Sequence, residues 1–501
     1  MSNSDSGELE RIGFNRILLA ISGLSVLTFL GDGALGGGVL LSGLSLGIDI
    51  RYFFLSLLIS AVVFIFFWFA LSEKFRGDPY FSNLISWTLT LIFIGFVLLS
   101  FLLKSGEIFL ILAVPAFNLL LFSLFSFTTR AISKTAMYPQ RGMHVAAGSS
   151  LGLLLSAIAI SLGNQSEGSS PYIIIGVTLA FAILPFWLVL IGWLPLKNKG
   201  IRYIGDSEKS VKRLASKSFW FAIISSSLFL IGSGVAHSVL LMEVSDIGET
   251  NRAIAYLFTI PLIFILTAIS DKVGRYALLI GAVSMNSVSQ ILAYSNSHAQ
   301  LVSAFEISGY YLALVFTMLK ISEELTPRNW KLYGLAWGVI FAADFIGALI
   351  STYLNFPPLA STLFSLTMMV VSVIVIFFTP KYLESDLQIR GILVLEDNKV
   401  VKNEGVNMEE IADLLPKESI SEGAAHIELE TGQKLVMQKH GKYTTAALVN
   451  LHSIDMVKKL QNFANEISKI EGTEDITSLL ISDIFGKIGD DEGSDVKFME
   501  M

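Results

Sequence analysis

The sequence contains no cysteine, which excludes disulfide bonds and thiolate metal sites from every part of the chain. Charge is also scarce: Asp, Glu, Lys and Arg make up 15% of the 501 residues, whereas about 25% is usual in soluble domains. Hydrophobic residues instead reach 53%, and the mean hydropathy is +0.65. A chain with so few charges cannot cover itself with a water-soluble surface, so its composition predicts a polytopic membrane protein.

Apolar runs of about 20 residues, the length that crosses a hydrocarbon core roughly 30 Å thick, mark the predicted spans. They form two sets of six, at 17–40, 52–71, 84–103, 107–127, 143–163 and 172–195, and at 219–242, 253–270, 276–294, 299–319, 332–354 and 359–379. A membrane β-barrel would instead show short segments of alternating polarity. The predicted fold is therefore an all-α polytopic membrane protein with twelve transmembrane helices.

Polar stretches divide the chain into domains. Residues 1–16 are polar and lack the basic region of a cleaved signal peptide, so we expect the first span to be retained. A basic linker, 196–218, separates an N-terminal six-helix half, 17–195, from a C-terminal half, 219–380. Residues 387–487 are predicted to form a small soluble α+β domain, and the acidic tail 488–501 is expected to be disordered.

Lysine and arginine predict the orientation of the spans, because these residues collect in cytoplasmic loops. With a cytoplasmic N-terminus, the inner loops before the soluble domain hold about 19 Lys and Arg residues, and the outer loops hold three, Arg51, Lys104 and Arg252. One missed span would reverse the alternation after it. The bias therefore supports the twelve spans, places both termini in the cytoplasm, and fits a multi-pass protein of the plasma membrane.

The stretch FLGDGALGGG in the first span contains G-x-G-x-x-G at Gly31, Gly33 and Gly36. In a dinucleotide-binding fold this motif joins a short strand to a helix, and an acid such as Asp49 ends a second strand. The segment from Gly36 to Asp49 is too short for both elements, so we expect no nucleotide and no other cofactor. The glycines instead permit local flexing of a gating helix, or serve only for close helix packing.

Similar segments recur in the two halves. FLGDG at 29–33 in the first span corresponds to LIGSG at 230–234 in the seventh, and ALSEKFRGD at 70–78 corresponds to AISDKVGRY at 268–276. Pro139 and Pro327 occupy similar loops before the fifth and eleventh spans. Two parallel repeats joined by a linker are typical of transporters whose substrate path lies between the halves.

These loops resemble those of the major facilitator superfamily, whose signature after the second and eighth spans is G-x-L-A-D-x-x-G-R. TAISDKVGR at 267–275 keeps the acid, glycine and arginine but begins with Thr267, whereas FALSEKFRG at 69–77 is more degenerate. YPQRG at 138–142 and LTPRNWKLYG at 325–334 also look like inner loops of this family. The resemblance covers roughly residues 15–380. It implies a central cavity lined by spans one, four, seven and ten, and flanked by two, five, eight and eleven.

The same loops predict a cytoplasmic gate. An acid at the end of one helix and an arginine one turn later can make charge-assisted bonds to neighbouring helix ends and hold one conformation. In the alternative interpretation the cations serve membrane topology alone. The candidate gate residues are Glu73, Lys74, Arg76, Asp271, Gly274 and Arg275.

Four ionisable residues within the spans, Asp32, His237, Glu306 and Asp344, predict a substrate and proton pathway together with Tyr310. Charge in an apolar span is costly and usually marks such a pathway. Glu306 and Tyr310 lie one turn apart on the same helix face. We expect the acids to load protons, with His237 as a relay or partner. Alternatively, Asp32 only bonds to the glycine-loosened backbone around it and His237 is a helix-packing residue.

The C-terminal domain is predicted to form strands at GILVLE, KVVKN, AHIEL, QKLVMQKHG and YTTAALVNL, with helices near 407–415, 454–471 and 475–487. The helix at 454–471 has an apolar face that includes Leu460, Phe463 and Ile467. This order is similar to longin-like or roadblock-like interaction modules. It predicts a regulatory or protein-binding role in the cytoplasm, without a catalytic or metal site.

The sequence therefore favours a secondary transporter of a small molecule, and its intramembrane acids predict coupling to protons. Two alternatives are an uncoupled facilitator and a non-transporting receptor that signals through the C-terminal domain. An enzyme is not expected, because the short outer loops leave no room for a reactive site. The expected partners are a small-molecule substrate, protons and the lipid bilayer, with no nucleic acid. The substrate and the direction of transport stay open.

Overall fold

The computed structural model describes residues 22–77, 79–135, 141–163, 217–243, 249–294, 299–325, 330–354, 357–377, 389–397, 399–405, 423–428, 434–449, 460, 462–467 and 481. These residues belong to two compact units. The membrane unit comprises the helices that end at Phe377, and the sheet unit begins at Ile389.

Eleven helices among the described residues are long and apolar enough to cross a membrane. The first span, Ser22–Ser45, contains a π-helix, η1 (Gly31–Gly36), and α2 (Gly37–Ser45). The other helices of the first half are α3 (Ile50–Gly77), α4 (Pro79–Leu102), α5 (Gly106–Ile108) continued by η2 (Phe109–Ala113) and α6 (Val114–Thr135), and α7 (Arg141–Gly163). The second half contains α9 (Lys217–Glu243), α10 (Glu249–Val273), α11 (Tyr276–Tyr294), α12 (Ala299–Glu324), α13 (Trp330–Leu354) and α14 (Pro358–Phe377).

The predicted all-α membrane fold is confirmed over these residues. Eleven of the predicted spans appear as helices, and the sixth, at 172–195, lies outside the described residues. Several helices extend beyond the apolar run that predicted them. For example, α3 continues to Gly77, although the apolar run ends near residue 71. A helix retains its backbone hydrogen bonds past the hydrocarbon, so its end is not set by hydropathy.

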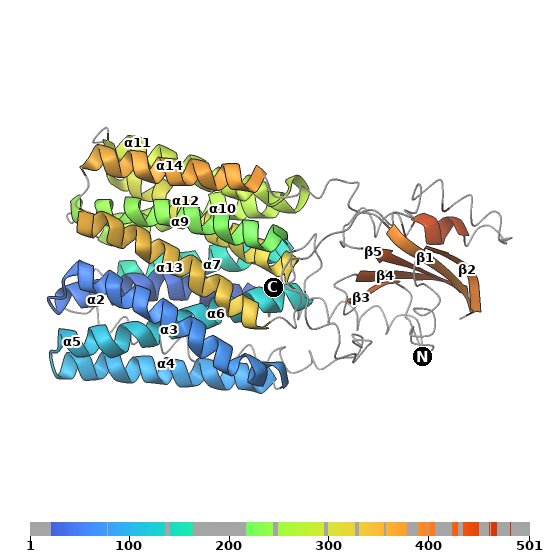
Figure 1. Ribbon diagram of the computed structural model, residues 1–501, viewed down its shortest axis with the longest axis horizontal. Helices are drawn as coiled ribbons and strands as arrows, with labels where there is room; N and C mark the ends of the chain where they lie inside the picture. The colour runs from blue at the N-terminus through green and yellow to red at the C-terminus, as the bar shows by residue number, and fades with distance from the viewer. Residues whose placement is uncertain are drawn as a thin grey trace. The chain divides into compact units, whose positions relative to one another are not determined.

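The two halves form two groups of helices, drawn in blue to cyan and in green to orange in Figure 1. The groups meet chiefly along two helix pairs, α3 with α13 and α7 with α10, and α6 also contacts α12 and α13. Within the second half, α13 also packs on α9, and within the first half η1 packs on α7. The predicted repeat is thus visible in the packing, because spans one and five pair in the first half as spans seven and eleven do in the second.

Matching glycines make these two pairings close. A Cβ added at Gly33 would lie 2.6 Å from Oγ of Ser156 on α7, and one added at Gly234 would overlap the main-chain oxygen of Asp344 on α13. Only a residue without a side chain lets two helices approach so closely. The repeated glycine motif therefore has a packing function in both halves.

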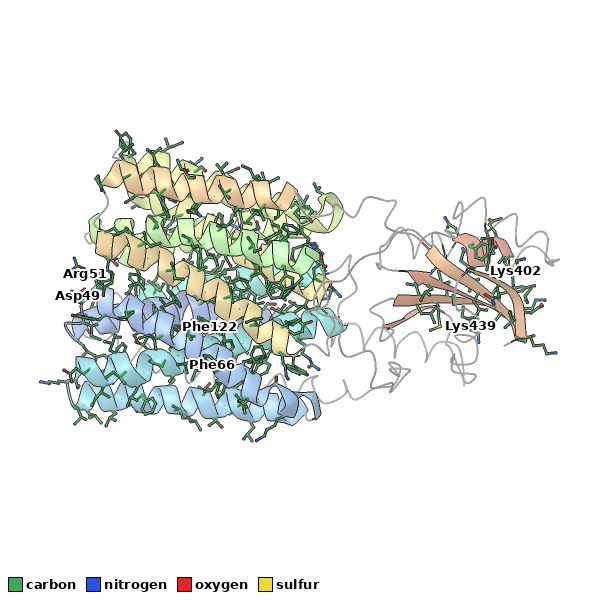
Figure 2. All side chains as sticks on the ribbon, viewed as in Figure 1. Asp49, Arg51, Phe66, Phe122, Lys402 and Lys439 are labelled. Carbon is green, nitrogen blue, oxygen red and sulfur yellow. The ribbon has the colours of Figure 1, made fainter. Side chains whose placement is uncertain are left out.

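Aromatic residues separate the outer surface of the membrane unit from its interior. Phe66 on α3 is 72% exposed, as expected of a side chain that faces lipid, whereas Phe122 on α6 is fully buried. Figure 2 labels both residues. Phe122 stacks on Phe341 of α13, with ring centroids 4.5 Å apart, and so ties the two halves together in their interior.

The sheet unit contains the five strands that the sequence predicts. They are β1 (Ile389–Glu396), β2 (Lys399–Gly405), β3 (Gly423–Glu428), β4 (Lys434–His440) and β5 (Tyr443–Val449). All neighbouring strands are antiparallel, in the order β2-β1-β5-β4-β3. Lys402 and Lys439, labelled in Figure 2, belong to β2 and β4.

A helix covers one face of this sheet. Leu460, Phe463 and Ile467 are buried against Ile392, Val394, Val436, Tyr443 and Ala447. These three residues confirm part of the predicted apolar face of 454–471. The helix at 407–415 lies outside the described residues, as does nearly all of 475–487.

Candidate functional site

The first span changes from α- to π-helix at Gly31–Gly36, the sequence GDGALG. A π-helical turn adds a residue to the usual spacing, is rare, and often occurs at functional sites. Here the hydroxyl of Tyr256 on α10 donates a hydrogen bond to the carbonyl of Gly33, over 3.4 Å. The helical distortion therefore provides a main-chain acceptor to the other half of the protein, and it exists at the glycines for which flexing was predicted.

Asp32, in this π-helix, interacts with Tyr310 of α12. The Tyr310 hydroxyl donates a hydrogen bond to the Asp32 carboxylate and lies close enough to the carboxylate of Asp344 on α13 to interact with it electrostatically. All three side chains are only partly buried, although buried residues flank them in their helices. These interactions join one acid of the first half to a tyrosine and an acid of the second half.

Two further tyrosines adjoin this group. Tyr311 and Tyr256 are each 2% exposed and are hydrogen-bonded to each other, with ring centroids 5.9 Å apart. The rings of Tyr310 and Tyr311 are 5.2 Å apart, and Phe29 of the first span lies 5.8 Å from Tyr311. We call Asp32, Asp344, Tyr256, Tyr310 and Tyr311 the central site.

The structure brings together three of the five residues that the sequence predicts for the pathway, Asp32, Tyr310 and Asp344. Glu306 is buried on α12, one turn before Tyr310, at 6% exposure. The backbone of His237 belongs to α9, but its side chain lies outside the described part of the chain. The candidate relay through His237 therefore stays a prediction.

The two halves are joined at one end of the membrane unit, which we call the basic end because Arg130, Arg141, Arg275 and Lys320 lie there. The indole N–H of Trp68 on α3 donates a hydrogen bond to the carbonyl of Trp330 on α13, over 2.6 Å. The guanidinium of Arg130 on α6 lies 3.5 Å from the centre of the Trp330 ring. These contacts hold the start of α13 against two helices of the first half.

Two more hydrogen bonds cross between the halves near this end. Trp337 on α13 donates to Thr129 of α6 over 3.0 Å, and Arg141 on α7 donates to the carbonyl of Ser322 on α12 over 2.8 Å. All four residues are buried. At the opposite end α3 and α13 also approach, but there Arg51 and Tyr353 are exposed and the guanidinium is 6.0 Å from the ring. Figure 2 labels Arg51 and Asp49 at that end.

Arg275, one of the predicted gate residues, is buried in a charge cluster on the second half. Its Nε donates to Glu323 on α12 over 2.6 Å, and its Nη1 donates to Ser270 on α10 over 2.8 Å. Lys320 adds a bond of 3.1 Å to Glu324. The predicted charge-assisted bond to a neighbouring helix end is thus present, with Glu323 as a partner that sequence reasoning missed.

The remaining gate candidates are only partly described. Gly274 has φ +102° in the turn between α10 and α11, a conformation that favours glycine. Lys74 is exposed at the end of α3. The side chains of Glu73, Arg76 and Asp271 lie outside the described residues, so their part in a gate stays a prediction.

Neither a known family model nor a curated protein sequence matches this chain. Solved structures do match it. A bacterial homologue of the iron transporter ferroportin, in an outward-facing state, superimposes with a TM-score of 0.53 and 14% identity over 72% of this chain and 98% of that one. FucP, a major facilitator superfamily transporter in the outward conformation, superimposes with a TM-score of 0.51 and 12% identity, over 73% of this chain and 100% of that one. The human organic anion transporter MFSD10 (TETRAN) superimposes with a TM-score of 0.51 and 13% identity, over 73% of this chain and 99% of that one.

The membrane unit has the major facilitator fold. In this fold the central site occupies the places that the resemblance implied, because Asp32 lies on the first span, Tyr310 and Tyr311 lie on the tenth, and Asp344 lies on the flanking eleventh. The chain is a multi-pass membrane protein with this fold, and the sheet unit follows it in the sequence.

Sequence reasoning missed most of the contacts between the halves. Arg130 entered only the count of basic residues in the inner loops, and Arg141 was also part of the loop YPQRG, but neither was expected to contact the other half. Trp68 and Trp330 carried no motif, although Gly334, one turn after Trp330, leaves the space that the Trp68 ring fills. Tyr256 could have been noticed only as one of the few polar residues of its span.

Proposed function

We propose that the protein is a secondary transporter that moves a small solute by alternating access and couples this movement to protons. The central site is the observation that carries the proposal. It combines Asp32 from the first half with Asp344 and Tyr310 from the second, so a change in the relation of the halves changes the surroundings of both acids.

Alternating access requires each end to close in turn, and the contacts at the basic end support this. They are single hydrogen bonds and one cation–π contact between helices of different halves. Each such bond contributes about 1 kcal/mol, so a set of them can hold one state without making it irreversible. We propose that this end faces the cytoplasm, as do both termini, in the plasma membrane.

Proton coupling follows from the cost of charge within a membrane. Protonation removes the charge of Asp32 or Asp344, and the cost of that charge depends on whether water reaches it. Coupling exists when the binding of the proton and that of the substrate are thermodynamically linked, which a shared site provides. Glu306 and His237 are further candidates, and Asp271 and Arg275 remain candidates for the gate. The sheet unit is proposed as a regulatory or protein-binding module.

Uptake into proteoliposomes tests this function. A substrate is first found by thermal-shift screening, because a ligand that binds the folded protein raises its melting temperature. Uptake is then measured with and without a pH gradient for the wild type and for Asp32→Asn, Glu306→Gln and Asp344→Asn. We expect gradient-driven accumulation by the wild type and its loss in at least one variant, with exchange across the vesicle preserved.

The matched control is Asp49→Asn, which neutralises an exposed acid at the opposite end of the bundle. It should accumulate substrate as the wild type does. If uptake by the wild type does not depend on the pH gradient, the protein is a facilitator or is coupled to another ion. Binding without any transport would favour the receptor alternative.

A further inference from the structure

The first span changes its helix type near its middle, and its glycines alone do not explain this change. The span is π-helical at Gly31–Gly36. The seventh span has the matching glycine motif at 230–234, yet α9 is a regular α-helix from Lys217 to Glu243. Both motifs pack closely on another helix, through Gly33 and through Gly234. The cause of the π-helix therefore lies outside the repeated glycines.

A proline is a common local cause of helix distortion, and it accounts for the other π-helix among the described residues. Pro115 lacks the N–H that would bond to Ile111, and Ile111 lies in η2 (Phe109–Ala113). The first span, 22–45, contains no proline. A π-helical turn is rare and strained, so it persists where surrounding contacts hold it.

Two of the contacts on this π-helix come from the other half. Tyr256 on α10 donates a hydrogen bond to the carbonyl of Gly33, over 3.4 Å, and Tyr310 on α12 donates one to the carboxylate of Asp32. The repeated loops after the second and eighth spans are 198 positions apart, so the counterpart of Tyr256 in the first half is Leu58. Leucine has no hydroxyl, and it cannot give α9 the bond that Tyr256 gives the first span.

The part of the first span before the π-helix is anchored within its own half. The hydroxyl oxygens of Thr28 and of Thr128 on α6 are 2.8 Å apart, and the rings of Phe29 and Phe125 are 6.1 Å apart. After the π-helix, α2 ends in a turn where Gly47 has φ +75° and an added Cβ would meet nothing within 4 Å. A change of helix type therefore turns α2 rather than the anchored part.

We propose that Tyr256 is a positioning residue, whose bond to Gly33 keeps the first span π-helical, and that release of this bond lets Gly31–Gly36 become α-helical. A π-helical turn holds one residue more than an α-helical turn, so its loss rotates the helix beyond it by about 100°. Each residue of α2 then takes the direction that the next residue has now.

This change of helix type connects the movement of the halves to Asp32. Because Asp32 lies within the π-helix, its direction changes with the helix type, and so does its interaction with Tyr310 and Asp344 of the other half. Resting on the function proposed above, the step belongs to the transport cycle. Separation of the halves at the central site withdraws Tyr256 from Gly33 and moves the acid at the same time.

Single cysteines on α2 distinguish rotation from loosening, since the chain has no other thiol. Leu40 is 7% exposed, and the rotation carries it toward the face of the exposed Leu44 and Ser45. Ser45 moves off this face, to the direction of the partly buried Leu46. In purified full-length protein, Tyr256→Phe should raise the reaction rate of Leu40→Cys with N-ethylmaleimide several-fold and lower that of Ser45→Cys several-fold.

Two further tyrosine variants complete the test. Tyr310→Phe removes the other hydroxyl that holds the π-helix, so it should change the two rates in the same directions. It keeps the inference testable if circular dichroism and the melting temperature show that Tyr256→Phe fails to fold. Tyr276→Phe is the matched control, because the Tyr276 hydroxyl is buried on α11 without a hydrogen-bond partner among the described residues. It should leave both rates as in the wild type.

Any pattern other than opposite changes at the two thiols would overturn the inference. Unchanged rates in Tyr256→Phe and Tyr310→Phe would exclude the positioning role, and faster reaction at both thiols would indicate loosening without rotation. Labelling needs no substrate, so its result is separate from that of uptake. Opposite changes without any transport would support the role of Tyr256 while the proposed function fails. Unchanged rates with proton-driven uptake would do the reverse.

Discussion

Glycine at position 234 lets α9 approach α13 at the place where α13 carries Asp344. An added methyl group would overlap the main-chain oxygen of Asp344, which cannot move as a side chain can. Gly95 in α4 is a matched control, since a Cβ there would meet nothing within 4 Å. The two glycines thus differ in function, although both lie within an apolar helix.

We therefore predict opposite effects of alanine at these two positions. Gly234→Ala should lower stability by about 1–3 kcal/mol, the usual range for overpacking, and should reduce transport. Gly95→Ala should be neutral or stabilising by up to about 1 kcal/mol, because alanine is the better helix former. Thermal unfolding in detergent measures both. Equal melting temperatures of the two variants would contradict the close packing of α9 on α13.

Arg275 offers a second test at the residue scale. Its partner Glu323 is on the same half of the protein, and the two side chains are 2% and 5% exposed. Loss of one partner of a buried ion pair typically costs about 3–5 kcal/mol, and the cost of losing Arg275 should lie at the low end because Lys320 remains 3.8 Å from Glu323.

We expect Arg275→Gln and Glu323→Gln each to lower the melting temperature, and the double variant to lose less than the sum of the two. If both single variants instead fold as stably as the wild type and lose only transport, Arg275 acts as a gate residue rather than as a structural one. Lys331→Gln, at an exposed position near the start of α13 on the same end, provides a control for loss of a cation.

At the scale of elements, α13 links the basic end to the central site. Trp330 and Trp337 near its start contact α3 and α6 of the first half, and Asp344 two turns later belongs to the central site. A helix transmits a shift of one end to the other because its backbone hydrogen bonds keep it stiff. A movement of α13 that separates the halves at the basic end would therefore change the surroundings of Asp344 as well.

The absence of cysteine makes this movement measurable. Thr129→Cys would carry the only thiol of the chain, at a position that is 0% exposed between α6 and α13. We predict slow reaction with a water-soluble maleimide, and a several-fold faster reaction after Trp68→Phe, which removes the indole donor, or Arg130→Gln, which removes the cation–π contact. Lys74→Cys, at an exposed position, gives the maleimide reaction rate of an accessible thiol for comparison.

Trp220→Phe is the matched control for this experiment, because Trp220 lies on α9 against Phe219 and takes no part in the described contacts between the halves. It should leave the labelling rate at Thr129→Cys unchanged. Acceleration by Trp220→Phe as large as that by Trp68→Phe would mean that the thiol reports loosening of the whole unit rather than opening of one end.

At the scale of the whole molecule, topology remains the most direct test of the twelve-span prediction. Because Lys and Arg accumulate on one side, a tag inserted after Gly168 and a tag at the C-terminus should lie on opposite sides of the membrane. Labelling of intact and permeabilised cells distinguishes the two sides. Exposure of both tags on intact cells would contradict the predicted topology, including the sixth span.

The residues of the central site illustrate how far sequence reasoning extends. Asp32, Asp344 and Tyr310 were predictable because an ionisable group inside a long apolar run is conspicuous. The rise of about 1.5 Å per residue in a helix then gives the depth of that group in the membrane. Their meeting was not predictable, since it depends on the π-helix at Gly31–Gly36 and on the rotation of α12 and α13. Tyr256 and Tyr311 carried no signal of their own, because aromatic residues are common in any apolar helix.

The sequence by itself determined that this chain crosses the membrane many times, that its halves repeat, and that a separate domain with five strands follows them. Each of these properties depends on local composition, since the length and hydropathy of a run decide whether it favours lipid, and alternation decides whether a strand has a buried face. Tertiary structure alone decided that Trp68 bonds to Trp330, 262 residues away. Helices in lipid gain little from hydrophobic burial against one another, so their pairing depends on shape and on a few polar groups, and these become visible only when the helices are packed.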